Sequence, residues 1–379
     1  MAQQVKVVAI FGTRPEVIKL APVILELNSR PGCFNVYVCA TAQHRQMLDQ
    51  ALKVFNIMVD EDLDIMTPGQ TLAEVTARAV ERLDRVMDRE QPDVVLVQGD
   101  TTTAFSGALA AYYHQVKVGH VEAGLRTANK YAPFPEELNR RLVGQLTDFH
   151  FAPTQRAREA LLHEGFPESS IFVTGNTVID ALLWVRELVH SQQPPLPDGL
   201  PECLEGHQMV LVTGHRRESF GEGFENICRA IRQVADLFPK VTFVYPVHLN
   251  PNVREPVNRI LGGHERIFLI DPLPYESFVW LMDRATVILT DSGGIQEEAP
   301  SLNKPVLVMR EVTERPEGVQ AGVSRLVGVK QESIADGLME LLSNPHVRQA
   351  MTTKQNPYGD GKAARRIADI LESRLLQQA

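Results

Sequence analysis

Short apolar runs alternate with amphipathic segments along the first half of the chain. The apolar runs predict strands at Val5–Phe11, Asn35–Ala40, Val94–Gln98, Val116–Val121 and Phe149–Ala152. The amphipathic segments predict helices at Pro15–Leu27, Arg45–Phe55, Leu72–Glu90, Thr103–Tyr113, Pro135–Leu146 and Gln155–Glu164. Alternation of this kind is typical of an α/β sheet whose parallel strands are joined by crossover helices.

The same pattern begins again after the middle of the chain. Its apolar runs predict strands at Met209–Thr213, Val241–Pro246, Ile267–Ile270, Val287–Thr290 and Pro305–Met309. Helices are expected between them, notably at Gly223–Leu237 and Tyr275–Met282. We therefore expect an α/β protein with two doubly wound halves of similar length.

The join between the halves has two possible positions. The Pro-rich stretch at 191–201 suggests a linker, but the helical pattern just before it could open the second half and leave that stretch as a surface loop. We place the boundary after residue 174, giving domains of residues 1–174 and 175–362. The terminal segment, 363–379, contains a predicted helix that could pack back on the first domain.

Composition narrows the class of partner. The formal charge of −9 argues against nucleic acid, which favours a basic protein surface. The four cysteines show neither CxxC pairing nor a metal-ligand spacing. The first apolar run is too short for a signal peptide, and no stretch approaches the ~18 apolar residues that span a bilayer. These features predict a cytoplasmic protein.

Polar residues follow the strands of the first half, at the edge where ligands bind in such sheets. Arg14 comes after the first strand, with Lys19 on the following helix, and forms a candidate anion clamp. Asp100 and Glu122 follow two further strands and are the candidate acid–base pair. Asp100 could equally cap the next helix, and the acids of the first turn near Glu136 could simply favour the helix dipole.

The strand ends of the second half carry groups suited to a phosphate. His215 stands in a Gly-His-Arg-Arg segment, and Ser292, Gly293 and Gly294 form a turn into a helix. Glu298, farther along that helix, is of the type that binds a ribose hydroxyl. Arg310, Glu314 and Arg315 follow the last expected strand, and one of them could complete the anion site. The alternative is an ordinary strand–helix turn beside a solvated basic loop.

The two halves thus differ in chemistry. Carboxylates at one set of strand ends suit acid–base work on a sugar, and cations at the other suit a diphosphate leaving group. The sequence contains no Walker loop and no GxGxxG motif. An enzyme that cleaves a sugar–diphosphate bond without a metal must offset the leaving charge with its own cations and amides.

Seven of the segments that follow one another along the chain are FGTRPEVIKLAPV, TAQHRQMLDQ, GDTTTAF, GHVEAGLRT, FPEELNRRL, TGHRRESFGEGFENI and LTDSGGIQEEAPSLNKPVLVMREVTERPE. Together these segments resemble the non-hydrolysing bacterial UDP-N-acetylglucosamine 2-epimerases. The resemblance implies a glycosyltransferase-B-like fold, in which two Rossmann-like domains face a central cleft, and a cytoplasmic homodimer. It also implies interconversion of UDP-GlcNAc and UDP-ManNAc, for surface polysaccharide synthesis, with no cofactor and no metal.

The resemblance also implies roles for residues. Asp100, Glu122, Glu136 and His215 are the expected catalytic groups, although it leaves open which carboxylate removes the C2 proton. The expected substrate contacts are Arg14, Lys19, Phe278, Ser292, Gly293, Gly294, Glu298 and Arg315. A second UDP-GlcNAc is expected as an allosteric activator, with candidate contacts at Gln43, His44, Gln46 and His248.

Three other functions remain open from the sequence. A glycosyltransferase of the same fold would pass the sugar to an acceptor, and a hydrolysing epimerase would release free ManNAc and UDP. A nucleotide-sugar sensor would bind without turnover. The carboxylate set argues against the sensor, and the absence of an acceptor-binding insertion argues against the transferase.

Overall fold

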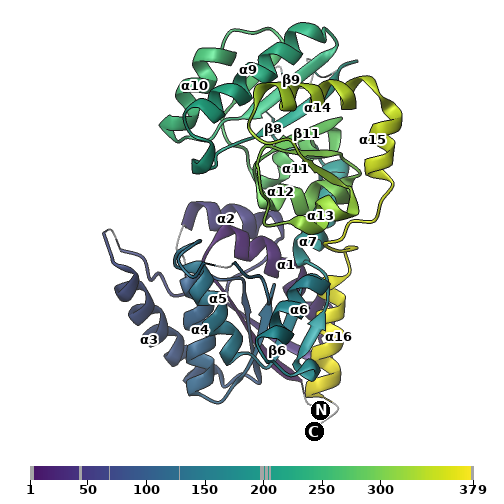
Figure 1. Ribbon diagram of the computed structural model, residues 1–379. Coiled ribbons are helices and arrows are strands. Elements are labelled where there is room, and N and C mark those ends of the chain that lie inside the picture. Colours follow the sequence, from purple (N-terminus) through teal and green to yellow (C-terminus); the bar gives the residue numbers. More distant parts are fainter. Residues whose placement is uncertain are drawn as a thin grey trace. The chain divides into compact units, whose positions relative to one another are not determined.

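The computed structural model describes residues 4–41, 45–67, 69–127, 129–196, 200, 204 and 206–376, with backbone only at 45–47. Contacts divide the chain into two compact units (Figure 1). Unit 1 comprises residues 1–181 and 358–379, and unit 2 comprises residues 182–357. The division falls inside the continuous helix α7, Thr177–Ser191, whereas the sequence placed the boundary after residue 174.

Unit 1 is built on a parallel sheet with the strand order β3-β2-β1-β4-β5-β6-β7. Its strands are β1 Val5–Phe11, β2 Phe34–Ala40, β3 Glu61–Asp62, β4 Val94–Gln98, β5 Lys117–Val121, β6 Phe149–Ala152 and β7 Ile171–Val173. Its helices are α1 Arg14–Asn28, α2 Arg45–Val54, α3 Leu72–Glu90, α4 Thr102–Tyr113, α5 Glu136–Leu146, α6 Gln155–His163, the start of α7 and α16 Ala363–Leu375. The central strands are almost wholly buried, as a parallel sheet covered on both faces requires.

Unit 2 repeats the arrangement with the order β10-β9-β8-β11-β12-β13, again all parallel. Its strands are β8 Gln208–Thr213, β9 Val241–Pro246, β10 Ile267–Ile270, β11 Val287–Thr290, β12 Val306–Val308 and β13 Ser324–Leu326. Its helices, besides the end of α7, are α9 Glu222–Leu237, α10 Pro251–Leu261, α11 Tyr275–Arg284, α12 Gly293–Glu298, α13 Pro316–Ala321, α14 Gln331–Ser343 and α15 Pro345–Thr352. Both sheets are doubly wound, which confirms the expected fold class.

Local chemistry explains where the helices begin. Thr71 caps α3 by accepting from the Glu74 N–H, while the Glu74 carboxylate accepts from the Thr71 N–H at 2.7 Å. The helix ends at Glu90, and the next residue, Gln91, adopts a left-handed conformation with φ 46°. A capping box of the same kind is present at the start of α1. Thr13 precedes that helix, and the Glu16 carboxylate accepts a hydrogen bond from the Thr13 N–H at 2.8 Å.

The final helix, α16 (yellow in Figure 1), belongs to unit 1. Arg30, just after α1, forms ion pairs with Asp369 and Glu372 of α16. The α16 N-terminus is held by Asp180, which accepts from the Ala364 N–H at 2.9 Å. The last helix is therefore anchored to unit 1 at both ends.

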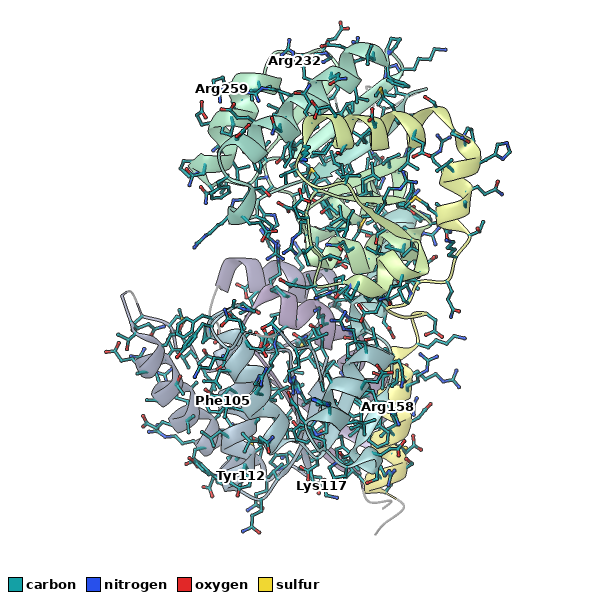
Figure 2. The ribbon with its side chains drawn as sticks, in the orientation of Figure 1. Phe105, Tyr112, Lys117, Arg158, Arg232 and Arg259 are labelled. Atoms are coloured by element: carbon teal, nitrogen blue, oxygen red, sulfur yellow. The ribbon has the colours of Figure 1, made fainter. Side chains whose placement is uncertain are left out.

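Unit 1 exposes several large apolar side chains on α4 and α5. Tyr112 and Tyr113, at the end of α4, are 60% and 61% exposed, and Leu138 and Leu142 lie one turn apart on α5. Figure 2 shows Phe105 and Tyr112 along α4, with Lys117 at the start of β5. Within the described residues, no helix has the length and apolarity needed to cross a membrane.

Candidate functional site

The strand order of unit 1 reverses direction between β1 and β4, so the loops after these strands diverge and leave space for a ligand. Glu122 follows the neighbouring strand β5 and adopts φ 69°, a left-handed conformation that is costly for a residue with a side chain. Its carboxylate forms an ion pair with Lys19 of α1 and accepts from Gln98 Nε2 at 3.1 Å. Two of the sequence-predicted residues, Lys19 and Glu122, are thus in direct contact.

Asp100 follows β4 and does not cap the helix after it. Thr101 does so instead, because its hydroxyl accepts from the Ala104 N–H at 3.0 Å. The Asp100 carboxylate is therefore available to pair with Arg140 of α5. Burial raises the pKa of Asp100, opposed by the charge of Arg140 and reinforced by that of Glu122. A carboxyl group with a raised pKa exchanges protons more readily near neutral pH.

Glu16 links the start of α1 to the start of α4, a role that the sequence did not reveal. Its buried carboxylate accepts from the Gly12 and Thr13 N–H groups and from the Thr13 and Thr101 hydroxyls. Burial is the largest influence on its pKa, which is raised despite these four donors. Arg14 is partly buried beside this junction, and Glu136 is partly buried at the first position of α5.

In unit 2 the reversal lies between β8 and β11, and a buried aspartate ties these two strand ends together. The Asp291 carboxylate accepts from the His215 and Arg216 N–H groups at 2.7 and 2.8 Å. Its other oxygen lies 3.4 Å from His215 Nδ1. Burial lowers the pKa of His215, with Asp291 acting in the opposite direction. His215 is thus held with its ring at the carboxyl edge of the sheet.

Two guanidinium groups converge near Gly293. A Cβ placed on Gly293 would lie 3.8 Å from Arg315 Cζ and 4.0 Å from Arg216 Nη2. Arg315 also forms an ion pair with Glu297, which neutralises that carboxylate in the last turn of α12. The glycine therefore leaves room for an anion next to the main chain and two cations.

Other predicted contacts of unit 2 lie around this position. Glu298 accepts from the Tyr275 hydroxyl at 3.1 Å, which ties α12 to α11, the helix that carries the partly buried Phe278. The exposed His248 stacks on His215 with ring centroids 5.5 Å apart. His248 therefore borders the candidate catalytic histidine. Gln43, His44 and the Gln46 side chain lie outside the described residues.

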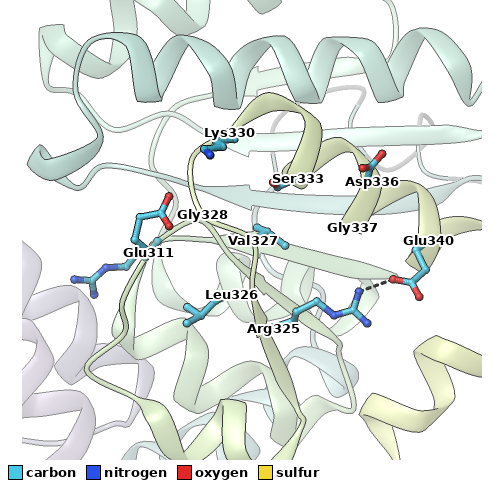
Figure 3. Close-up of a pocket in the computed structure, with 11 residues that line it drawn as sticks. Glu311, Arg325, Leu326, Val327, Gly328, Lys330, Ser333, Asp336, Gly337 and Glu340 are labelled. Atoms are coloured by element: carbon cyan, nitrogen blue, oxygen red, sulfur yellow. Dashed lines mark hydrogen bonds and ion pairs between the residues drawn. The ribbon is translucent and has the colours of Figure 1, made fainter.

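A groove of unit 2 is separate from these groups. It has a volume of about 660 Å³ and lies beside β13 and the start of α14 (Figure 3). Its Arg325 pairs with Glu340, and Arg310, on its border, pairs with Glu218. The groove contains none of the residues predicted as substrate contacts.

The residues that sequence reasoning missed are partners of the predicted ones. Gln98 and Arg140 contact Glu122 and Asp100, and Asp291 contacts His215. Gln98 is the last residue of β4 and Asp291 follows β11 directly. Their positions at the carboxyl ends of predicted strands could have marked them as candidate site residues. Arg140 lies inside an amphipathic helix, and its sequence context does not distinguish it from an ordinary surface arginine.

Comparison with known proteins identifies the chain. The two doubly wound units form a glycosyltransferase-B-like fold. A crystal structure of a putative UDP-N-acetylglucosamine 2-epimerase from Listeria monocytogenes has the same fold, with a TM-score of 0.93. The two sequences are 47% identical, and the match covers 99% of this chain and 98% of that one. The family model for UDP-N-acetylglucosamine 2-epimerase matches residues 26–372. The Escherichia coli K12 UDP-N-acetylglucosamine 2-epimerase is 56% identical over 97% of this chain and 98% of its own length. The chain therefore belongs to the UDP-N-acetylglucosamine 2-epimerase family.

A related structure was solved with a nucleotide sugar. The Neisseria meningitidis UDP-GlcNAc 2-epimerase bound to UDP-GlcNAc is 48% identical, with a TM-score of 0.88 over 97% of this chain and 99% of that one.

Proposed function

We propose that this protein is a non-hydrolysing epimerase that interconverts UDP-GlcNAc and UDP-ManNAc. Family membership over nearly the whole chain supports the substrate. The observation that carries the proposal is the pairing of Asp100 with Arg140 and of Glu122 with Lys19, next to one another at the strand ends of unit 1. Two ionisable carboxylates in one site are what a reaction needs when it removes and returns a proton.

The proposed first step eliminates UDP. The C2 proton of the sugar is not adjacent to a carbonyl and is too weakly acidic to be removed alone. A carboxylate takes this proton, the C2–H electrons form a C1=C2 double bond, and the C1–O bond breaks with its electron pair leaving on UDP. The products are 2-acetamidoglucal and UDP, both still bound.

The proposed second step reverses the first on the other face of the sugar. An acid of the same carboxylate set delivers a proton to C2 from the opposite side, and a β-phosphate oxygen of UDP attacks C1 to restore the glycosidic bond. Atoms and electrons balance without an oxidant or a cofactor. Glu136, at the start of α5, is a further candidate for these proton transfers.

In this proposal unit 2 holds the leaving group. Arg315, the Ser292–Gly294 turn and Arg216 surround the diphosphate, and Arg14 is a further diphosphate contact. The negative charge of a diphosphate next to His215 would favour its protonated form, so His215 can give a proton to the departing phosphate oxygen. Glu298 accepts from the ribose, and Phe278 borders the uracil.

The wider role is also a proposal. We place the enzyme in the cytoplasm as a homodimer that supplies UDP-ManNAc for bacterial surface polysaccharide. A second UDP-GlcNAc would act as an activator at the segment of Gln43, His44 and Gln46, with His248. A sigmoidal dependence of rate on UDP-GlcNAc concentration is the expected sign of that second site.

A solvent-isotope experiment tests the proposed reaction. UDP-GlcNAc incubated with the protein in D₂O should acquire deuterium at C2 in both epimers, because the proton is exchanged during each passage through the glucal. Magnetic resonance of the C2 position measures this directly. Epimers without deuterium would contradict the mechanism. Release of free ManNAc and UDP would indicate a hydrolysing epimerase, and transfer to an added acceptor would indicate a glycosyltransferase.

A further inference from the structure

Helix α5 holds the Asp100 loop at two points. Asn139 Nδ2 donates to the Asp100 backbone carbonyl at 3.0 Å, and the Arg140 guanidinium pairs with the Asp100 carboxylate. Two consecutive residues of one helix therefore bind the main chain and the side chain of Asp100. The position of α5 and the direction of the Asp100 carboxylate are coupled.

Glu137, in the same helix, holds the Arg140 side chain in place. Its carboxylate is fully buried and lies 3.3 Å from Arg140 Nη1. It also accepts from the Thr127 N–H at 3.0 Å and from Arg141 Nε at 2.8 Å. A buried carboxylate is costly unless it is paired and hydrogen-bonded, so Glu137 restrains Arg140 strongly.

Arg140 holds this position in spite of an unpaired donor. The Arg140 side chain is only 12% exposed. Its Nε is buried and has no hydrogen-bond partner among the described residues. A buried donor without a partner destabilises a fold. The guanidinium is therefore oriented by the two carboxylates, Glu137 on one side and Asp100 on the other.

The two candidate acids have separate cations. Lys19 pairs with Glu122, and Arg140 pairs with Asp100. The charge of Glu122 disfavours ionisation of Asp100, and the charge of Arg140 offsets that effect. Arg140 thus acts on one member of the carboxylate pair and distinguishes it from the other.

We propose that Arg140, anchored by Glu137, is the positioning residue that directs the Asp100 carboxylate for proton transfer. This inference rests on the proposed epimerase function. If so, α5 contributes to the reaction through the Arg140–Asp100 ion pair as well as through Glu136. The sequence pattern does not predict this ion pair.

The test compares Arg140→Gln with the matched control Arg141→Gln. Both arginines contact Glu137, but Arg141 pairs with Glu137 and the Thr127 carbonyl rather than with Asp100. Arg140→Gln should lower kcat by about 10²-fold, the scale of an ångström-sized misplacement of a reacting group. It should leave UDP affinity, measured by calorimetry, unchanged. Arg141→Gln should keep kcat within about threefold of the wild type, because Arg140 and the Thr127 N–H still satisfy the Glu137 carboxylate.

The pH profile separates positioning from general support of the fold. Loss of the Arg140 charge raises the pKa of Asp100, so the limb of the kcat/KM profile that reports Asp100 should move to higher pH. Arg140→Lys should restore the position of that limb and recover only part of kcat, because an ammonium keeps the charge without the guanidinium geometry. An unchanged profile in Arg140→Gln, or equal losses in the two glutamine variants, would overturn the proposal.

The same experiment distinguishes this inference from the proposed function. If the wild-type protein does not epimerise UDP-GlcNAc, the proposed function fails. If the wild type exchanges deuterium at C2 and Arg140→Gln does so at the wild-type rate, only the role of Arg140 fails. Thermal unfolding of each variant confirms that the comparison is made between folded proteins.

Discussion

At the scale of single residues, the candidate acids of unit 1 are held in costly states. Glu122 adopts a left-handed backbone conformation, and the pKa of Asp100 is raised by burial. Backbone strain and a raised pKa both persist only where surrounding contacts enforce them, and such features cluster at functional sites. In this unit Lys19 and Gln98 hold the Glu122 carboxylate. Burial and the charge of Glu122 raise the pKa of Asp100 against the opposing charge of Arg140.

Removing the charge of either acid should affect turnover and not nucleotide binding. Asp100→Asn and Glu122→Gln should each lower kcat by on the order of 10²–10⁴, the usual contribution of an acid–base residue. UDP affinity should stay close to that of the wild type, because the proposed diphosphate contacts lie mainly in unit 2. Steady-state kinetics and calorimetry with UDP measure the two effects. Full activity in either variant would remove that residue from the mechanism.

At the scale of secondary-structure elements, strands β5 and β6 place two histidines side by side in the core of unit 1. His120 and His150 are paired in the register of these strands. Burial lowers the pKa of His120 to about 4 and that of His150 to about 3. His120 Nε2 lies 2.7 Å from the Gly99 carbonyl, whereas both nitrogens of His150 are buried without a hydrogen-bond partner among the described residues. Burial therefore favours the neutral imidazole of both histidines.

This arrangement predicts an acid-sensitive unit 1. A histidine whose pKa is lower in the folded state contributes stability that is complete above its ordinary value of 6.5 and is lost as pH falls below it. At pH 5 the loss should be about 2 kcal/mol for His150, since each pKa unit corresponds to about 1.4 kcal/mol. Urea unfolding at pH 7.5 and pH 5 should show a smaller loss for His150→Leu than for the wild type. The exposed His163, replaced by Leu, serves as the control and should keep the wild-type difference. Equal losses in His150→Leu and the wild type would contradict the prediction.

At the scale of the whole molecule, the exposed apolar side chains of unit 1 bear on the proposed homodimer. Tyr112, Tyr113, Leu138 and Leu142 project from α4 and α5, two helices that lie against each other. Exposed apolar groups gathered on neighbouring elements are common at protein–protein interfaces. We expect this surface to mediate the association of two chains.

Charge placed on that surface should produce monomers. The double variant Leu138→Glu with Leu142→Glu should shift the mass measured by light scattering from about twice the chain mass to the chain mass of 42.3 kDa. Leu237, an exposed leucine at the end of α9 in unit 2, provides the control, and Leu237→Glu should leave the mass unchanged. A double variant with the wild-type mass would place the interface elsewhere, and a monomeric wild type would contradict the homodimer.

The local pattern of apolar residues predicted most of the fold. The expected strands at Val5–Phe11, Val94–Gln98 and Val241–Pro246 agree with the structure at both ends. The strands without an expectation were β3, β7 and β13, which have two or three residues and lie at sheet edges. An edge strand this short carries too little pattern to be recognised, because its pairing partner defines it. The equally short β12 lies inside its sheet and was expected at Pro305–Met309.

Sequence pattern was enough to predict that two doubly wound α/β units would form, which family the chain belongs to, and which strand ends would carry acids and cations. These properties are local, because burial selects apolar strands and because ligand-binding groups follow strands directly. The tertiary structure alone decided which charges meet. Lys19 reaches Glu122 across 103 residues of sequence, and Arg140 reaches Asp100 across 40. Such contacts depend on how helices α1 and α5 pack on the sheet, and no spacing along the chain records that packing.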